Sequence, residues 1–315
     1  MKYSYYPGCT LHSTGAEYGA STLAVFRALG IELEEVADWN CCGATSAHSL
    51  DHDLAVLLAG RNLALAQRTG RDVVVPCAAC FSRLRHAEVA LAEDPELQRR
   101  LSAAVNIPWG GRVAVESAVS VIAHRVDADD IARRVQVPLR GLKVVPYYGC
   151  LLTRPRAVTG VGNPDHPTSL DGLLSLLSAE VLEWSYKTDC CGGSLALGRP
   201  DQVVRLVGRL AARAVEAGAE CIVTACPMCQ SNLEMRQPGG SRIPVLYFTE
   251  LMGLAFGRSP ATAEVGGAAG GLSVPASLPG RRRPPPGRAS SAPRRQAAPG
   301  RSVQGAVGPP GFGAR

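Results

Sequence analysis

The chain of 315 residues lacks the features of several common protein classes. It has no run of roughly eighteen apolar residues, the length that a membrane-spanning helix needs. No apolar stretch follows Lys2, so we expect no secretory signal. The G-x-G-x-x-G fingerprint of NAD and FAD sites is also missing. These absences predict a cytoplasmic protein with no membrane span.

An excess of positive charge is missing from most of the chain. The formal net charge is +6, but residues 258–315 hold nine arginines and one acid, which leaves about −2 on residues 1–257. We therefore expect no nucleic-acid partner for the body of the protein. The Pro/Gly/Arg-rich segment 258–315 cannot bury enough apolar surface to fold, which predicts a disordered tail. A dispensable extension is the simpler interpretation of this tail, and a basic docking arm is the alternative.

Cysteine is abundant, with eleven residues, and ten of them form an internal repeat. One cysteine, a CCG motif and a CxxC motif follow one another twice, with 34 residues between the CC pair and the CxxC motif in each copy. The interval before the CC pair is 31 residues in the first copy and 39 in the second. We place the eight extra residues in the loop around 160–167, which is rich in turn formers. A repeat of about 140 residues indicates a duplicated domain.

Strand-like and helix-like segments alternate in both halves. Strands are expected at 2–6, 31–36, 73–75, 143–148, 181–184 and 221–224, and helices at 14–29, 54–67, 88–104 (interrupted at Pro95), 117–124, 129–135 and 202–217. This alternation predicts an α/β fold with two duplicated cysteine-rich Rossmann-like domains and mainly parallel sheets. The domains are expected at 1–140 and 141–257. Residues 81–140 should serve as connecting helices, without a counterpart of equal length in the second half.

The cysteines follow strand ends, where open α/β sheets place their ligands. Five thiols could therefore gather at one edge of each sheet. Disulfides are disfavoured in a reducing cytosol, and a structural zinc site needs only four ligands. Thiolates are the usual ligands of iron–sulfur clusters, so a cluster accounts best for five. The remaining cysteine, Cys221, lies in an apolar strand and should be a buried small hydrophobe.

Residues beside the cysteines suit such a site. Glycines allow close approach of the backbone and positive φ angles, and they stand at positions 8, 43, 149, 192 and 193. Pro227 predicts a helix that begins at the second CxxC motif and favours thiolate there. Phe81 either shields the first site or packs in the core. His12 and His48 are weaker candidates for contact with a substrate or cluster.

The motifs YYPGC, WNCCGA, VPCAAC, YYGC, KTDCCGGS and TACPMC resemble the B subunit of CoB–CoM heterodisulfide reductase over residues 1–257. The resemblance implies two noncubane [4Fe–4S] clusters. The first would be held by Cys9, Cys41, Cys42, Cys77 and Cys80, and the second by Cys150, Cys190, Cys191, Cys226 and Cys229. It further implies that a disulfide, or a related thiol couple, is split between the clusters, each of which takes one sulfur at an open iron. Catalytic side chains are unknown, because this chemistry takes place at the clusters.

The chain lacks the C-x2-C-x2-C-x3-C-P run of ferredoxins. The resemblance therefore implies a ferredoxin-like C subunit and a flavoprotein or other electron donor as partners, and a small-molecule disulfide or thiols as substrate. Such a complex could place the protein peripherally at a membrane. Two alternatives stay open. One is the quinone-reactive E-type subunit of succinate dehydrogenases and fumarate reductases, which has the same doubled motif, and the other is a noncatalytic metal-stabilised scaffold.

Overall fold

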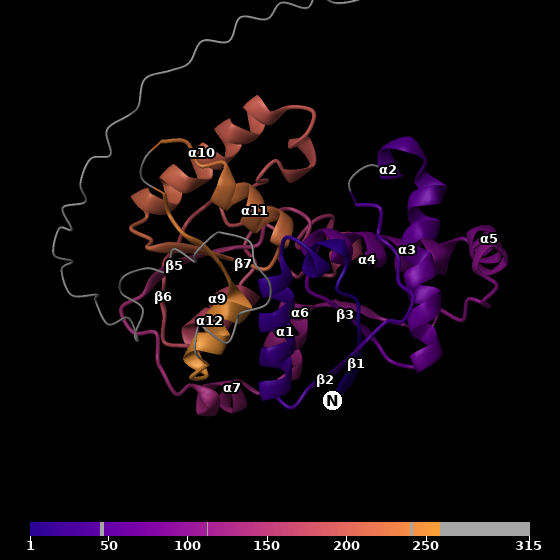
Figure 1. Ribbon diagram of the computed structural model, residues 1–315, viewed down its shortest axis with the longest axis horizontal. Helices are drawn as coiled ribbons and strands as arrows, with labels where there is room; N and C mark the ends of the chain where they lie inside the picture. Colours follow the sequence, from indigo (N-terminus) through magenta and orange to yellow (C-terminus); the bar gives the residue numbers. More distant parts are fainter. Residues whose placement is uncertain (45–46, 112, 240–241, 259–315) are drawn as a thin grey trace, which may run out of the picture. The chain divides into compact units, whose positions relative to one another are not determined.

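The computed structural model describes residues 1–44, 47–111, 113–239 and 242–258 (Figure 1). Two four-stranded sheets, whose paired strands are all parallel, form its framework. The first contains β1 (Lys2–Tyr5), β2 (Glu32–Glu35), β3 (Val73–Val75) and β4 (Val115–Ser117) in the order β2-β1-β3-β4. The second contains β5 (Lys143–Tyr147), β6 (Glu180–Val181), β7 (Cys221–Thr224) and β8 (Val245–Tyr247) in the order β6-β5-β7-β8. The predicted duplicated α/β fold is confirmed.

Helices connect the strands of both sheets. In the first half they are η1 (Cys9–His12), α1 (Ala16–Ala28), α2 (Ala47–Leu50), α3 (His52–Ala66), η2 (Gln67–Thr69), α4 (Ala78–Glu93), α5 (Pro95–Val105), α6 (Ala118–Arg125) and α7 (Ala128–Arg134). In the second half they are α8 (Arg156–Thr159), α9 (Ser169–Leu176), η3 (Gly193–Leu195), α10 (Pro200–Glu216), α11 (Pro227–Met235) and α12 (Phe248–Ala255). The predicted tail, 258–315, lies outside the described residues except for Arg258.

Local sequence explains where these elements begin and end. Every residue of β3 and β7 is buried, as expected for the central strands of a parallel sheet. The Asp51 carboxylate accepts the amide of Leu54 and caps α3. Residues 67–69 leave that helix through a short 3₁₀ turn that ends at Gly70, a left-handed glycine. The buried strands and capped helices together fix the positions of the loops that carry the cysteines.

Two sequence predictions need correction. Segment 181–184 is not a strand beyond Val181, because β6 is only the two-residue edge pair Glu180–Val181. Residues 81–140 are not only connectors, because β4 and α6 match β8 and α12 of the second half in order and in sheet position. Sequence analysis gave no strand at β4 or β8, which are three-residue strands at the edges of their sheets. The true excess in the first half lies in α5 and α7.

The two halves differ most between the first cysteine and the second strand. In the first half this segment contains α1, of 13 residues, whereas α9 in the second half has only 8. The chain instead makes the short helix α8 and a loop at 160–168 before α9 begins. This loop is where the sequence predicted the extra residues.

The halves pack against each other through equivalent helices. Helix α1 lies beside α12 of the other half (Figure 1), and α9 correspondingly contacts α6. The rings of Tyr18 and Tyr247 stack across this interface, with centroids 4.2 Å apart and planes 5° from parallel. The Tyr18 hydroxyl lies 3.2 Å from the carbonyl oxygens of both Pro76 and Ala225, the residues that precede the two CxxC motifs. The interface therefore ties the two cysteine sites together.

Glu250, in the capping box of α12, gives this interface a pH dependence. One carboxylate oxygen accepts the amide of Tyr247, and the other is buried without a hydrogen-bond partner. Burial, and then the charge of Glu17 on α1, raise the pKa of Glu250 to about 7. Between about pH 4.5 and 7 the unfolded chain loses this proton while the folded chain keeps it. The free energy of unfolding therefore falls as pH rises through this window.

We expect Glu250→Gln to remove most of that fall, which amounts to about 3 kcal/mol from a shift of this size. Glutamine keeps an acceptor for the Tyr247 amide but carries no charge. Urea unfolding of the full chain at pH 5 and pH 8 measures the effect. Glu93→Gln, at an exposed position, is the control and should leave the pH dependence unchanged. An equal fall in wild type and Glu250→Gln would contradict the assignment.

Candidate metal centres

The two CxxC motifs stand at helix N-termini that follow central strands. Cys77 is the N-cap of α4, and Cys226 is the N-cap of α11. Cys80 and Cys229 lie three residues further on, in the first turn of these helices. The predicted helix start at Pro227 is confirmed. Helix N-termini present backbone N–H groups and partial positive charge, which suit thiolates.

The CC pairs fold onto the CxxC motifs in the same way in both halves. The Sγ atoms of Cys42 and Cys80 are 3.3 Å apart, and those of Cys191 and Cys229 are 3.5 Å apart. Two further cysteines complete each group. In the first half, Cys9 helps to raise the pKa of Cys41, after the larger influences of Cys42 and burial. In the second half, the Sγ atoms of Cys150 and Cys190 are 3.8 Å apart. The structure thus gathers the ten predicted cysteines into two groups of five, and their role as ligands remains a prediction.

Each group has a buried and an outer part. Cys42, Cys77 and Cys80 are buried in the first half, as are Cys191, Cys226 and Cys229 in the second. Cys9, Cys41 and Cys190 are exposed, and Cys150 is half-buried. A cofactor bound by all five thiols would therefore be held in the interior on one side and accessible to solvent on the other.

Hydrogen bonds between thiols spread their pKa values apart. The bond from Cys41, followed by that from Cys80, lowers the pKa of Cys42 to about 4. The bond from Cys150 lowers the pKa of Cys190 to about 6. The same bonds raise the pKa of Cys41 and Cys150, so in each pair one thiol ionises readily and metal binding must displace the proton of the other.

The two groups meet at the interface between the halves. The hydrogen bond to Cys226 is the largest influence raising the pKa of Cys77. Cys229 first, and Cys77 second, lower the pKa of Cys226. Helix N-termini alone would lower the pKa of both, so contact across the interface explains why Cys77 moves the other way. The innermost thiols of the two groups are therefore neighbours.

Gly8 and Gly149 precede the first cysteine of each group and leave room for the CxxC sulfur. A Cβ atom on Gly8 would lie 2.8 Å from the Sγ atom of Cys80, and one on Gly149 would lie 3.2 Å from that of Cys229. Both have positive φ angles, of 71° and 67°. Of the other predicted glycines, 43 and 192 also have positive φ, but Gly193 does not, so that part of the prediction is wrong.

A tyrosine that was not among the predicted site residues supports each group. The Tyr6 hydroxyl donates to the carbonyl of Asn40 at 2.7 Å, and that of Tyr147 donates to the carbonyl of Asp189 at 2.6 Å. Both acceptors immediately precede the CC pairs. After burial, the largest influences on the pKa of each tyrosine are four cysteines of its own group, and they raise it. The signal was present in the sequence, since each tyrosine stands three residues before its first cysteine.

We expect Tyr6→Phe to loosen the first CC pair without unfolding the protein. The loss of one hydrogen bond should lower the free energy of unfolding by about 1 kcal/mol and leave the Asn40 carbonyl without this partner. Urea unfolding measures the loss of stability. The visible absorption of the reconstituted protein measures cofactor retention, in Tyr6→Phe and in the equivalent variant of the second half, Tyr147→Phe. Tyr3→Phe is the control. Tyr3 lies in β1, and no cysteine is among the groups that shift its pKa. A spectrum identical to wild type in both site variants would contradict a positioning role.

The remaining candidates have other surroundings. His12 pairs with Glu35 at 3.1 Å and lies against the ring of Trp39, and the side chain of His48 is outside what the structure describes. Phe81 and Cys221 are buried.

All eleven cysteines are free thiols. Among the described residues, no group of three or more His, Cys, Asp or Glu side chains is arranged to hold a single metal ion, and no helix is long and apolar enough to cross a membrane.

The fold and site together define a duplicated α/β protein with five thiols at the edge of each sheet. The family of the CCG cysteine-rich domain matches residues 3–85 and again 144–234. The chain therefore belongs to this family and carries its domain twice. The family includes iron–sulfur proteins and subunits of oxidoreductase complexes.

Relatives with defined complexes span nearly the same length. The chain is 32% identical over 265 residues to the 8-methylmenaquinol:fumarate reductase membrane anchor subunit of Wolinella succinogenes, covering 81% of this chain and 92% of that protein. It is 27% identical over 272 residues to the B subunit of the ferredoxin/F(420)H(2)-dependent CoB-CoM heterodisulfide reductase of Methanosarcina acetivorans, covering 82% and 90%. A hypothetical protein from Helicobacter pylori of known structure superposes with a TM-score of 0.63 at 10% identity, over 83% of this chain and 50% of that chain, which shows the fold alone.

Proposed function

We propose that each half of this protein holds one [4Fe–4S] cluster through its five cysteines and that the chain is the iron–sulfur subunit of an oxidoreductase complex. The observation that carries the proposal is the repeated gathering of five thiols. The donor set fits, because thiolates are the ligands such clusters use. Gly8 and Gly149 fit as well, since a Cβ atom at Gly8 would collide with the Sγ atom of Cys80 and one at Gly149 would crowd that of Cys229. Bound clusters would supply the one-electron chemistry that the protein's own side chains lack.

The reaction we propose is the reduction of a disulfide or related thiol couple, at clusters of the noncubane type. A disulfide takes up two electrons and two protons and yields two thiols. The Tyr18 hydroxyl lies 3.2 Å from the carbonyl oxygens of both Pro76 and Ala225, the residues before Cys77 and Cys226, which supports two neighbouring sites. The exposed rim cysteines leave each group open to a small molecule. Two adjacent one-electron sites suit a two-electron substrate.

The electrons would come from partner subunits. A ferredoxin-like C subunit and a flavoprotein or other donor are the partners that we propose, in line with the complexes named for the relatives. Docking beside the rim cysteines would bring a partner's cofactor close to the clusters. Through such a complex the protein could lie at a membrane surface.

Quinol chemistry in a complex of the fumarate reductase type is the second candidate. It is favoured by the identity of 32% over 265 residues to the Wolinella succinogenes subunit. A quinol gives up two electrons and two protons, so it makes the same demand for two adjacent one-electron sites. In that case the electrons would leave through the partner subunits.

Anaerobic purification of the full chain tests the proposal. We expect iron and sulfide at about eight atoms each per chain, as two four-iron clusters require. Zinc in place of iron would overturn it in favour of the metal-stabilised scaffold. Chemically reduced protein is then mixed with 2-hydroxyethyl disulfide or with menadione. Faster reoxidation by the disulfide supports the first reaction, faster reoxidation by menadione supports the second, and reoxidation by neither contradicts both.

A further inference from the structure

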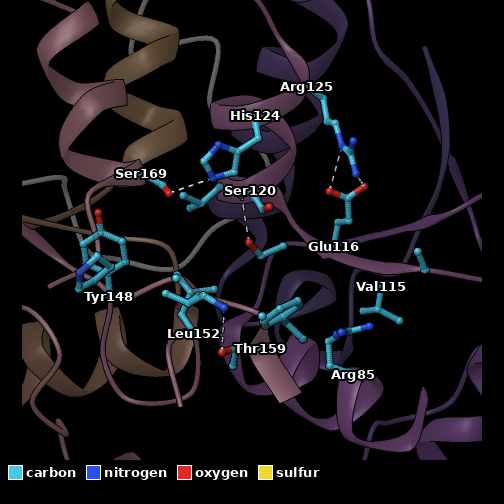
Figure 2. Close-up of a pocket in the computed structure, with 18 residues that line it drawn as sticks. Arg85, Val115, Glu116, Ser120, His124, Arg125, Tyr148, Leu152, Thr159 and Ser169 are labelled. Carbon is cyan, nitrogen blue, oxygen red and sulfur yellow. Dashed lines mark hydrogen bonds and ion pairs between the residues drawn. The ribbon is translucent and has the colours of Figure 1, made fainter. Parts of the chain in front are cut away.

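A cavity of about 350 Å³ opens between the two halves (Figure 2). Helices α4 and α6 and strand β4 line one side, and residues 148–169 line the other. Phe81, Val119 and Leu152 contribute apolar surface. Hydrogen-bonding groups from both halves, among them His124 and Ser169, share the same space. The lining is therefore amphipathic, with an apolar part and a polar part.

The cavity lies where the structures of the two halves differ. On one side of the interface the long helix α1 packs along α12. On the equivalent side α9 is five residues shorter than α1 and packs against α6. The loop that precedes α9 contributes Gly160, Val161, Gly162 and Pro167 to the lining. The segment that distinguishes the second half from the first thus builds this cavity.

The charges around the cavity are already paired. Arg85 forms an ion pair with Glu88 at 2.7 Å. Arg125 forms one with Glu116 at 3.3 Å, which Figure 2 shows. An anion would have to compete with these carboxylates for the two guanidinium groups. A neutral ligand meets no such competition, so the charge pattern favours an uncharged occupant.

Hydrogen-bonding groups nevertheless face the space. The Nε2 atom of His124 and the hydroxyl of Ser169 lie 3.1 Å apart across the boundary between the halves (Figure 2). Ser120 lies beside them on α6. The Tyr148 hydroxyl is occupied, because it donates to Asp171 and accepts the amide of Leu170. When His124 Nε2–H donates to Ser169, the Ser169 hydroxyl keeps its own proton to donate, so Ser169 and Ser120 are the groups best placed to bind an acceptor oxygen.

The cavity is close in the chain to both cysteine groups. Phe81, in its lining, directly follows Cys80 of the first group. Leu152 is two residues after Cys150 of the second group. Phe81 and Leu152 therefore connect the lining with both cysteine groups through one or two residues of chain.

We infer that this cavity binds a neutral, flat ring compound with carbonyl oxygens, the chemistry of a quinone headgroup. The ring would pack against the apolar part of the lining, and a carbonyl oxygen would accept a hydrogen bond from the His124–Ser169–Ser120 side. The inference rests on the second of the two reactions proposed above. It adds the location of the site and the residues that distinguish it.

The test uses the anaerobically purified full chain and menadione, with binding followed by equilibrium dialysis. Gly162 lines the cavity, and a Cβ atom there would meet nothing within 4 Å, so Gly162→Trp should fold while its ring fills the space. Gly172, on the exposed side of α9, is equally unobstructed and lies outside the lining, so Gly172→Trp is the matched control. We expect binding to weaken at least about tenfold in Gly162→Trp and to stay unchanged in Gly172→Trp. Ser169→Ala should weaken it about fivefold, the effect of one hydrogen bond.

The outcomes separate this inference from the proposed reaction. If menadione still reoxidises the protein and binds Gly162→Trp as tightly as wild type, the quinone acts elsewhere and the cavity assignment is wrong. If the wild-type chain neither binds nor reacts with menadione, both fail together. Competition by phosphate or succinate at the same site would also overturn the assignment, because it would show that the paired arginines accept an anion.

Discussion

Gly8→Ala is expected to empty the first cysteine site and leave the second intact. Gly8 has φ 71° and ψ 166°, a conformation that essentially only glycine adopts, so a side chain there costs about 1–3 kcal/mol. The added Cβ atom would also lie 2.8 Å from the Sγ atom of Cys80 and push this thiol out of its group. Iron should fall from about eight to about four atoms per chain, as one four-iron cluster is lost. Iron and sulfide analysis after anaerobic purification provides the measurement.

Gly70→Ala is the control that separates backbone strain from collision. Gly70 also has a positive φ, of 66°, but a Cβ atom there would meet nothing within 4 Å. This variant should lower the free energy of unfolding by about 1–2 kcal/mol and keep its full iron content. A Gly8→Ala protein that retains about eight iron atoms would show that Cys80 does not bind where we place it.

Removing a buried thiol should have an effect of similar size on the second site. Cys191 is buried and contacts Cys229 at 3.5 Å, so Cys191→Ala leaves its group with four thiols. We expect iron to fall to about four atoms per chain, with the first cluster still visible by EPR.

Cys221→Ala provides the comparison within the same half. Cys221 is fully buried in β7, and burial, followed by the charge of Glu220, raises its thiol pKa to about 12. It belongs to neither group, so its loss should leave the iron content unchanged. Equal iron loss in Cys191→Ala and Cys221→Ala would mean that general destabilisation, and not the loss of a ligand, explains both.

The fold could be predicted as far as local pattern reaches. The spacing of ten cysteines indicated the duplication, and the apolar runs at β3 and β7 indicated buried parallel strands. The edge strands β4 (VES) and β8 (VLY) were not predicted, and each directly precedes a helix. They exist because the neighbouring central strand supplies hydrogen-bond partners, which is a tertiary effect.

The candidate site was predictable in its thiols but not in its supports. Cysteines are recognisable by residue type, whereas Tyr6 and Tyr147 look like ordinary strand-end aromatics until their hydroxyls meet the residues before the CC pairs. His12 stood close to Cys9 in the sequence, yet its ring pairs with Glu35. A short distance along the chain therefore did not predict which side chains lie next to the thiols in space.

The sequence by itself determined the repeat, the ten candidate thiols and the alternation of strands and helices, because each depends on residue type and short-range spacing. Only the tertiary structure decided that Cys77 meets Cys226, that the halves join through α1 with α12 and α9 with α6, and that a cavity opens beside the loop before α9. Such contacts join residues as far apart in the chain as Ser21 and Thr249, which are separated by 228 positions. Which residues come together depends on how whole helices pack, and no local pattern encodes that choice.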